Sequence, residues 1–401
     1  MRGKPSILVS WYTDPAAIPP FVLSPAQVTV GPKLRPDQPR LMYAGRTPTG
    51  VYDLKAALET QRLATRYDLV VVYADASGMN FPLNLDAFDC PKVLVVGDTH
   101  HLKSPLRQII EYARDAHVDF VVSICNRQHV HWFRAAGFAR VAWFPSLAIR
   151  HVPRPFPASR KPQLGFVGHS GAHHPRRARL IALLLAAGLP LAAGTGSREV
   201  TADVYAESLA SFNASLNGDL NFRLFEVLSA GGCLLTDRLA PQSGLGLLLE
   251  EEHHYFAYDT PDELLDQARY LLGHPERALE VARAGNAAFI QSMLPDKRAA
   301  DLLAWVFEDR LDDLYRVPVD GQADPAVELM DRLRIYEALQ QLHLEKERPR
   351  VLFEPAVPQV YRSDAADLRR LEAIVGPAGA DCGPWDAVVS AGPQGVACTV
   401  T

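Results

Sequence analysis

Unbroken runs of Val, Leu and other apolar residues recur in the first part of this 401-residue chain, and stretches with helical spacing separate them. A strand that is apolar on both faces lies inside a sheet that is covered on both sides, and alternation with helices is typical of a parallel sheet. The predicted strands are 7–9, 69–73, 92–96, 120–124 and 141–144, and the predicted helices are 53–66, 104–116 and 126–136. The sequence therefore predicts an α/β domain over residues 1–150.

A proline-rich segment, 151–162, interrupts this pattern with prolines at 153, 155, 157 and 162. Proline excludes helix interiors and central strands, so we interpret the segment as an interdomain linker. The alternation then restarts and predicts a second α/β domain over 163–310. Its predicted strands are 164–167, 189–192 and 233–236, and its predicted helices are 176–187, 201–211 and one that begins at Thr260 with a capping box to Glu263. Residues 311–401 are expected to form a C-terminal helix (325–347) and a small accessory unit, with strands at 350–353 and 386–390 and a helix at 364–375.

Composition describes an ordinary globular protein, because 48% of the residues are hydrophobic and 22% are charged. A net charge of -5 gives no support to general nucleic-acid binding, and we interpret the basic residues Arg176, Arg177 and Arg179 as a solvated helix face. The longest apolar stretch, 180–194, contains Gly188 and Pro190 and is too short to span a membrane. The five scattered cysteines favour reduced thiols and a cytoplasmic protein.

The most informative segment runs from Asn213 to Asp237. Asp219 or Asn221 can cap a helix that Gly231 and Gly232 end, and a short buried strand follows. Arg223 and Glu226 are three residues apart, so they share a face near the N-terminus of that helix. A helix N-terminus and an arginine suit a phosphate, and a glutamate can accept hydrogen bonds from sugar hydroxyls. The alternative is a surface ion pair, which contributes little.

The run Asn221-Phe-Arg-Leu-Phe-Glu-Val-Leu-Ser-Ala-Gly231 resembles the signature of CgeB-like glycosyltransferases with the GT-B fold, and so do Tyr258-Asp-Thr-Pro-Asp-Glu-Leu-Leu265 and His274-Pro-Glu-Arg277. The resemblance implies two Rossmann-like parallel-sheet domains that face a central cleft. It also implies an enzyme that transfers a sugar from a nucleotide-diphospho-sugar, such as a UDP- or GDP-sugar, without an obligatory metal or other cofactor. The first domain would hold the acceptor, for which a glycan, a protein and a small molecule all fit.

The resemblance extends to single residues of the second domain. Glu226 would contact the donor ribose, and Arg223 with the helix N-terminus at Asn221 would face the diphosphate. Gly168 and His169 follow the first strand of this domain, where a glycine allows close backbone approach to a phosphate or forms a tight turn. Tyr258 would line the nucleotide pocket or end a strand.

One position departs from the pattern of many retaining GT-B enzymes, which carry two glutamates eight positions apart. With Glu226 as the second, the first position holds Gly218, and Asp219 stands beside it. Retention of the anomeric configuration is therefore expected only by analogy. A non-catalytic scaffold that binds nucleotide sugars is the alternative function.

In the first domain, Asp98, His100 and His101 follow the predicted strand 92–96. Residues at the carboxyl end of such a strand face the cleft, where an Asp or His could take a proton from an acceptor hydroxyl. The alternative is that Asp98 caps the helix near residue 104. The paired histidines lack the spacing of a zinc site, and no metal site is predicted.

Overall fold

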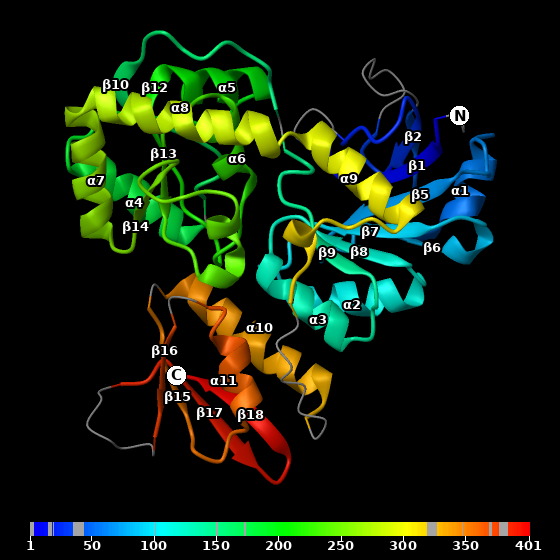
Figure 1. Cartoon of the computed structure of the whole chain (residues 1–401). Helices are drawn as coiled ribbons and strands as arrows, with labels where there is room; N and C mark the ends of the chain where they lie inside the picture. The colour runs from blue at the N-terminus through cyan, green and yellow to red at the C-terminus, as the bar shows by residue number, and fades with distance from the viewer. Residues whose placement is uncertain are drawn as a thin grey trace.

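The computed structural model describes residues 4–14, 18, 20–34, 44–100, 102–149, 151–171, 174–318, 327–346, 348–368, 371–376 and 384–401. Three units are apparent in Figure 1. We call them the first domain (4–149 with 295–318), the second domain (161–294) and the C-terminal unit (327–401). Residues 151–160 connect the first two without regular secondary structure. Within the described residues, no helix is both long and apolar enough to cross a membrane.

The first domain is built on a seven-stranded parallel sheet with the order β3-β2-β1-β5-β7-β8-β9. Its strands are β1 Ser6–Trp11, β2 Ala26–Gly31, β3 Ala44–Arg46, β5 Leu69–Ala74, β7 Lys92–Val96, β8 Phe120–Ser123 and β9 Val141–Trp143. A smaller parallel pair, β4 Gly50–Asp53 and β6 Asn80–Leu83, lies beside it, and the helices are α1 Leu54–Thr60, α2 Pro105–Asp115 and α3 Val130–Ala135. The five strands predicted from apolar runs are all present. Those missed are short or lack such a run.

The second domain has a five-stranded parallel sheet with the order β11-β10-β12-β13-β14. Its strands are β10 Lys161–Val167, β11 Leu191–Gly194, β12 Ser208–Phe212, β13 Leu234–Asp237 and β14 Phe256–Tyr258, and its helices are α4 Pro175–Ala186, α5 Arg198–Glu207, α6 Phe222–Ser229, α7 Pro261–Gly273 and α8 Pro275–Ser292. The Thr260 cap of α7 is confirmed, because Thr260 Oγ1 accepts from the Glu263 N–H at 3.1 Å. The helix predicted over 201–211 is wrong at its end, where β12 is buried between two strands.

After α8 the chain returns to the first domain as α9 (Pro295–Glu308), although the sequence placed this segment in the second domain. Trp305 of α9 packs on Phe120 of β8 and on Phe144, with ring centroids 4.9 and 5.9 Å apart. Arg298 donates from Nε to the Pro145 carbonyl at 3.1 Å. The buried face of α9 therefore closes one side of the first sheet, as Figure 1 shows.

The C-terminal unit consists of a four-stranded sheet and two helices, and it lies below both domains in Figure 1. The helices are α10 Leu329–Glu345 and α11 Gln359–Ala365, and the strands are β15 Arg350–Phe353, β16 Glu372–Val375, β17 Ala387–Gly392 and β18 Gly395–Val400. The helix predicted over 364–375 is wrong. The chain there ends α11, where Asp364 pairs with Arg332 of α10, and then forms β16 as a parallel neighbour of β15.

We expect Trp305→Ala to lower the free energy of unfolding by about 3–5 kcal/mol, because it removes a large buried ring and leaves a cavity beside β8. Trp305 is 5% exposed, whereas Phe307 on the same helix is 43% exposed. The control Phe307→Ala should therefore change stability by about 0.5 kcal/mol or less. Urea unfolding of the three proteins measures this, and equal losses in both variants would contradict the packing of α9.

Candidate functional site

The carboxyl ends of the two large sheets face each other, as the sequence predicted, and the loops at these ends are in contact. The loop 213–221, which connects β12 to α6, reaches across to the loops that follow β7 and β8. The Leu220 N–H donates to the Cys125 carbonyl at 3.0 Å, and Asn217 Nδ2 donates to the His100 carbonyl at 2.6 Å. Ligands of open α/β sheets bind at this edge, so the junction is the candidate site.

His100 lies between carboxylates of both domains. Its Nδ1 is 3.0 Å from Asn126 Oδ1, which accepts a hydrogen bond and so assigns the proton to Nδ1. Its Nε2 lies 3.6 Å from Asp219 Oδ2 and 4.0 Å from Asp98 Oδ1. His100 and Asp219 are buried, whereas the Asp98 side chain is 39% exposed. This arrangement can hold an acceptor hydroxyl beside a carboxylate and an imidazole.

Of the three residues predicted in this loop, Asp98 and His100 lie close together at the junction, and His101 lies outside the described residues. The alternative role for Asp98, capping α2, is not what is observed. The N–H groups of Leu106 and Arg107 at the start of α2 instead donate to Glu337 Oε1 of α10, at 3.0 and 3.1 Å.

In the second domain, Arg223 folds back beneath the end of β10. Its Nε donates to the Val167 carbonyl at 2.9 Å, and its Nη1 donates to Asn213 Oδ1 at 2.9 Å. Gly168 has a φ of +149°, and a Cβ atom there would come within 2.1 Å of Arg223 Nη2. The glycine is therefore required for the arginine to reach this position, which is more than a tight turn demands.

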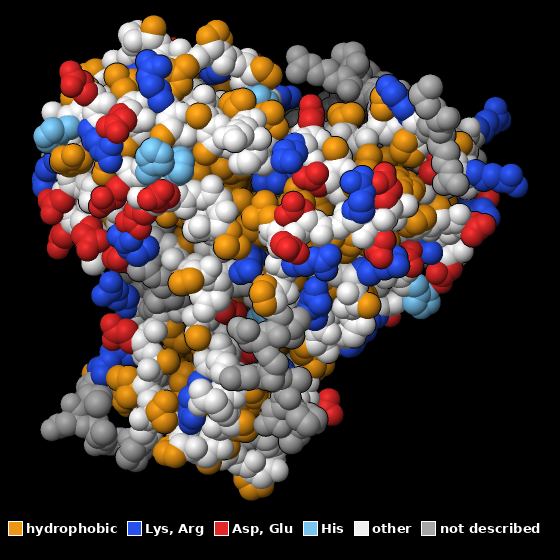
Figure 2. Space-filling model, in the orientation of Figure 1, with side chains coloured by type: hydrophobic (Ala, Val, Ile, Leu, Met, Phe, Trp, Pro, Cys, Tyr) orange, Lys and Arg blue, Asp and Glu red, His pale blue; other side chains and the backbone are white. Residues whose placement is uncertain are grey.

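Two further arginines belong to the same cluster, and the sequence interpretation of them as a solvated face was wrong. Arg176 and Arg177 begin α4, directly after the loop from β10, and are only 8% and 7% exposed. Arg176 Nη1 pairs with Asp237 Oδ2 at 3.0 Å. Their position in the sequence could have indicated this role, because they lie at the start of the helix that follows the first strand of a Rossmann-like domain. By contrast, acidic side chains gather on the surface near α7 in Figure 2. Asp262, in the first turn of this helix, is exposed.

Among the described residues, no carboxylate accepts a hydrogen bond from the charged side chain of Arg177. Its Nη1 and Nη2 donate to the carbonyls of His169 and Ala214, at 2.9 and 3.0 Å, and its Nε is buried without a described partner. Burial and then the like charge of Arg223 lower the pKa of Arg177 to about 10. A bound anion would relieve this repulsion, so the cluster is suited to a diphosphate.

The other predicted residues of the second domain differ in their surroundings. Glu226 is buried one turn after Arg223, near Tyr205. Burial raises the pKa of Tyr205 to about 12. The charge of Arg223 opposes this rise, and the charge of Glu226 adds to it. Asn221 is the N-cap residue of α6, but neither it nor Asp219 caps the helix with its side chain; Asp219 accepts from the Leu216 N–H instead. The His169 side chain is exposed.

Tyr258 has the second of its two predicted roles, because it ends a strand. It is fully buried at the end of β14, and its hydroxyl donates to the Asn213 carbonyl at 2.8 Å. It therefore supports the loop 213–221 from behind. Among the described residues, no group of three or more His, Cys, Asp or Glu side chains is arranged to hold a metal ion.

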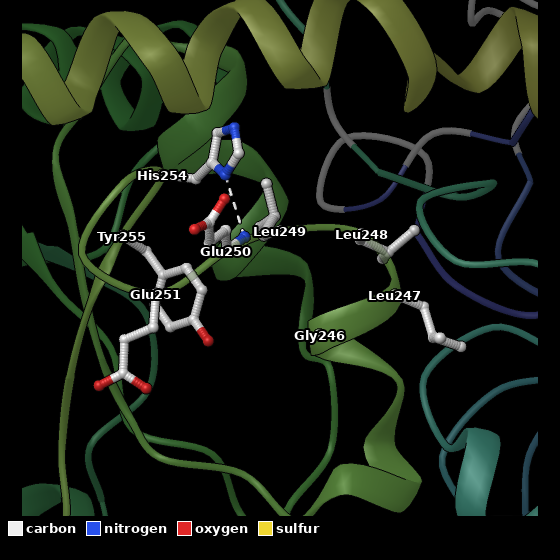
Figure 3. Close-up of a pocket in the computed structure, with 8 residues that line it drawn as sticks. All are labelled: Gly246, Leu247, Leu248, Leu249, Glu250, Glu251, His254 and Tyr255. Carbon is white, nitrogen blue, oxygen red and sulfur yellow. Dashed lines mark hydrogen bonds between the residues drawn. The ribbon is translucent and has the colours of Figure 1, made fainter.

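An open pocket of about 610 Å³ lies elsewhere in the second domain, within residues 246–255 (Figure 3). Figure 3 shows Glu251 and Tyr255 on one side of it and Leu247 and Leu248 on the other, with the His254 ring hydrogen-bonded to the Glu250 N–H. None of the predicted site residues lines this pocket, so we do not assign the site to it.

Two Rossmann-like parallel-sheet domains with their carboxyl edges opposed define a GT-B protein. Residues 194–304 match the family model described as "Glycosyl transferase-like". The chain is similar in structure to a glycosyltransferase from Rickettsia africae (TM-score 0.52, 9% identity, 76% of this chain and 98% of that chain). No curated protein matches the sequence.

Two further solved structures share the fold. HepE of Anabaena, in complex with UDP and glucose, has a TM-score of 0.53 at 12% identity and covers 74% of this chain and 99% of its own. Sucrose-phosphate synthase from Thermosynechococcus elongatus has a TM-score of 0.51 at 11% identity and covers 76% of this chain and 100% of its own. The predicted GT-B fold is confirmed.

At the edge of the site, burial and then the charge of Arg176 lower the pKa of His343 from 6.5 to about 4. Because the pKa of His343 is lower in the folded state than in the unfolded state, the unfolded state binds more protons as the pH falls below 6.5. Stability therefore decreases as the pH is lowered. We expect His343 to contribute about 2 kcal/mol of the stability lost between pH 7 and pH 5. Urea unfolding of wild type and His343→Asn at both values measures this, because groups common to both cancel. An equal loss in the two proteins would contradict it.

Proposed function

We propose that this protein is a glycosyltransferase of the CgeB-like kind, which transfers a sugar from a nucleotide-diphospho-sugar to an acceptor hydroxyl. The observation that carries the proposal is the buried cluster of Arg176, Arg177 and Arg223 at the carboxyl edge of the second sheet, opposite His100 and Asp98 of the first. Cations on one side and a carboxylate–imidazole pair on the other suit the two ends of a glycosyl transfer.

In the proposed reaction the bond between the sugar C1 and the diphosphate oxygen breaks, and a bond from C1 to the acceptor oxygen forms. The guanidinium groups stabilise the charge that develops on the departing nucleoside diphosphate, so a metal ion is not required for that purpose. Asp98 accepts a hydrogen bond from the acceptor hydroxyl. The hydroxyl proton passes to the departing phosphate if the configuration is retained, as we propose, or to Asp98 if it is inverted.

The experiment that tests the function is calorimetry with UDP, GDP, CDP and dTDP and their common sugars, with and without magnesium. We expect one nucleotide to bind saturably and magnesium to leave its Kd unchanged. Transfer to an acceptor panel, followed by NMR of the product anomer, then reports activity and stereochemistry. Binding without transfer or donor hydrolysis would favour the scaffold alternative, which Gly218 at the first glutamate position motivates. The predicted cytoplasmic location stays a prediction.

Glu226→Gln should raise the Kd of the bound nucleotide about tenfold or more, because a carboxylate that accepts from ribose hydroxyls becomes a neutral amide. The substitution keeps the size of the side chain, so the fold should persist. Glu250→Gln, an exposed acid of the same domain, is the matched control and should bind like wild type. Calorimetry decides, and an unchanged Kd in Glu226→Gln would remove this residue from the nucleotide site.

Asp98→Asn should lower kcat about a hundredfold while changing the donor Kd little, because the carboxylate acts on the acceptor hydroxyl and not on the nucleotide. The control is Asp86→Asn, an exposed carboxylate of the same domain. Steady-state kinetics with donor and acceptor varied separately measures the split. Wild-type turnover in Asp98→Asn would exclude Asp98 from the reaction.

A further inference from the structure

Helix α10 of the C-terminal unit presents four polar side chains to the other two domains. Tyr336, Glu337, Gln340 and His343 are spaced so that they share one face of the helix, and all four are at least nine-tenths buried. The Tyr336 hydroxyl is hydrogen-bonded to His129 Nε2 at 2.8 Å, and the Glu337 carboxylate accepts hydrogen bonds from the start of α2. Gln340 and His343 reach the candidate site itself.

Hydrogen bonds around Asn217 determine that His343 Nδ1 carries a proton. Asn217 Nδ2 donates to two carbonyls, those of His100 at 2.6 Å and Gln340 at 3.1 Å, so the amide orientation is determined. Its Oδ1 then accepts from His343 Nδ1 at 2.5 Å, and an amide oxygen only accepts. His343 therefore carries a proton on Nδ1. Because burial lowers the pKa of this ring to about 4, it is neutral at pH 7 and its Nε2 is an acceptor.

Several buried polar atoms at this junction have no hydrogen-bond partner among the described residues, including Gln128 Oε1 and both side-chain polar atoms of Asn221. Three more belong to residues near Thr99 and His100. They are His343 Nε2, Gln340 Oε1 and Asn126 Nδ2. His343, Gln340 and Asn126 are 7%, 2% and 0% exposed. Gln340 Nε2 donates to the Thr99 carbonyl at 3.1 Å, and Asn126 Oδ1 is bonded to His100, so these two residues contact the Thr99–His100 segment. His343 is connected to the same segment through Asn217, which donates to the His100 carbonyl. Native proteins seldom leave buried polar atoms unpaired, so such atoms near a site are expected to bind ordered water or a ligand.

The chemistry of these atoms selects the ligand. Two acceptors and one donor, all neutral, match hydroxyl groups, because each hydroxyl both donates and accepts. An anion would be repelled by the two acceptors, and a cation would leave the Asn126 N–H groups unpaired. We propose that Asn126, Gln340 and His343 form a subsite for a hydroxyl-rich, uncharged acceptor, a sugar or the end of a glycan, and that α10 supplies one wall of it. This inference rests on the proposed function and names its acceptor class.

The experiment is calorimetry of the full chain with glucose, galactose, mannose and N-acetylglucosamine, each with and without saturating UDP. His343→Asn is the informative variant, because the asparagine amide retains a donor for Asn217 and lacks an atom at the position of Nε2. We expect at least one sugar to bind wild type, and its Kd to rise about three- to tenfold in His343→Asn, as the loss of one hydrogen bond implies. Gln341→Ala, an exposed neighbour on α10, is the matched control and should bind like wild type.

Two results would overturn the subsite. One is that no sugar of the panel binds wild type with or without UDP, which would mean that the unpaired atoms serve ordered water only. The other is that a sugar binds with the same Kd to wild type and His343→Asn while near-ultraviolet circular dichroism shows both folded. UDP binding in the absence of sugar is measured separately and tests the proposed donor site, so the two proposals fail in different ways.

Discussion

The amide of Asn217 is the contact on which the rest of the structure depends, since both its protons and its oxygen are used by groups from three parts of the chain. Each partner is buried, so losing one bond would leave a polar group without water to replace it. These bonds connect the loop 213–221 of the second domain to the first domain and to α10. The same arrangement brings His100 within reach of Asp219.

Hydrogen bonds also fix the charged side chains of the second domain. Asp237 accepts from Arg176, from the Ser215 N–H at 2.8 Å and from the Ser215 hydroxyl at 2.5 Å, so one carboxylate ties α4 to the loop 213–221. Arg223 is supported by carbonyl and amide oxygens instead. Arg177 and Arg223 are thus held by neutral oxygens, which orient the two guanidinium groups.

The two domains could be predicted because buried parallel strands need unbroken apolar runs, as in Leu69–Tyr73. Strand β12 could not, because Ser208-Leu-Ala-Ser-Phe212 continues the helical spacing of α5 and becomes a strand only between two neighbours. Arg223 and Glu226 were found from local helix geometry. The contacts of α10 were not, because Gln340 and Thr99 are 241 residues apart and nothing local indicates that they meet.

The chain passes between the first and second domains twice, through 151–160 and again where Met293 leads into α9. Ser146 donates to the Met293 carbonyl at 2.7 Å, and the rings of His151 and Phe289 have centroids 5.5 Å apart, so the two crossings lie close together at this end. Two neighbouring connections resist twisting of one domain against the other. The easiest movement is then a hinge rotation about the axis that passes through both connections. A protease that cut the proline-rich connection would therefore leave the halves joined by the second connection.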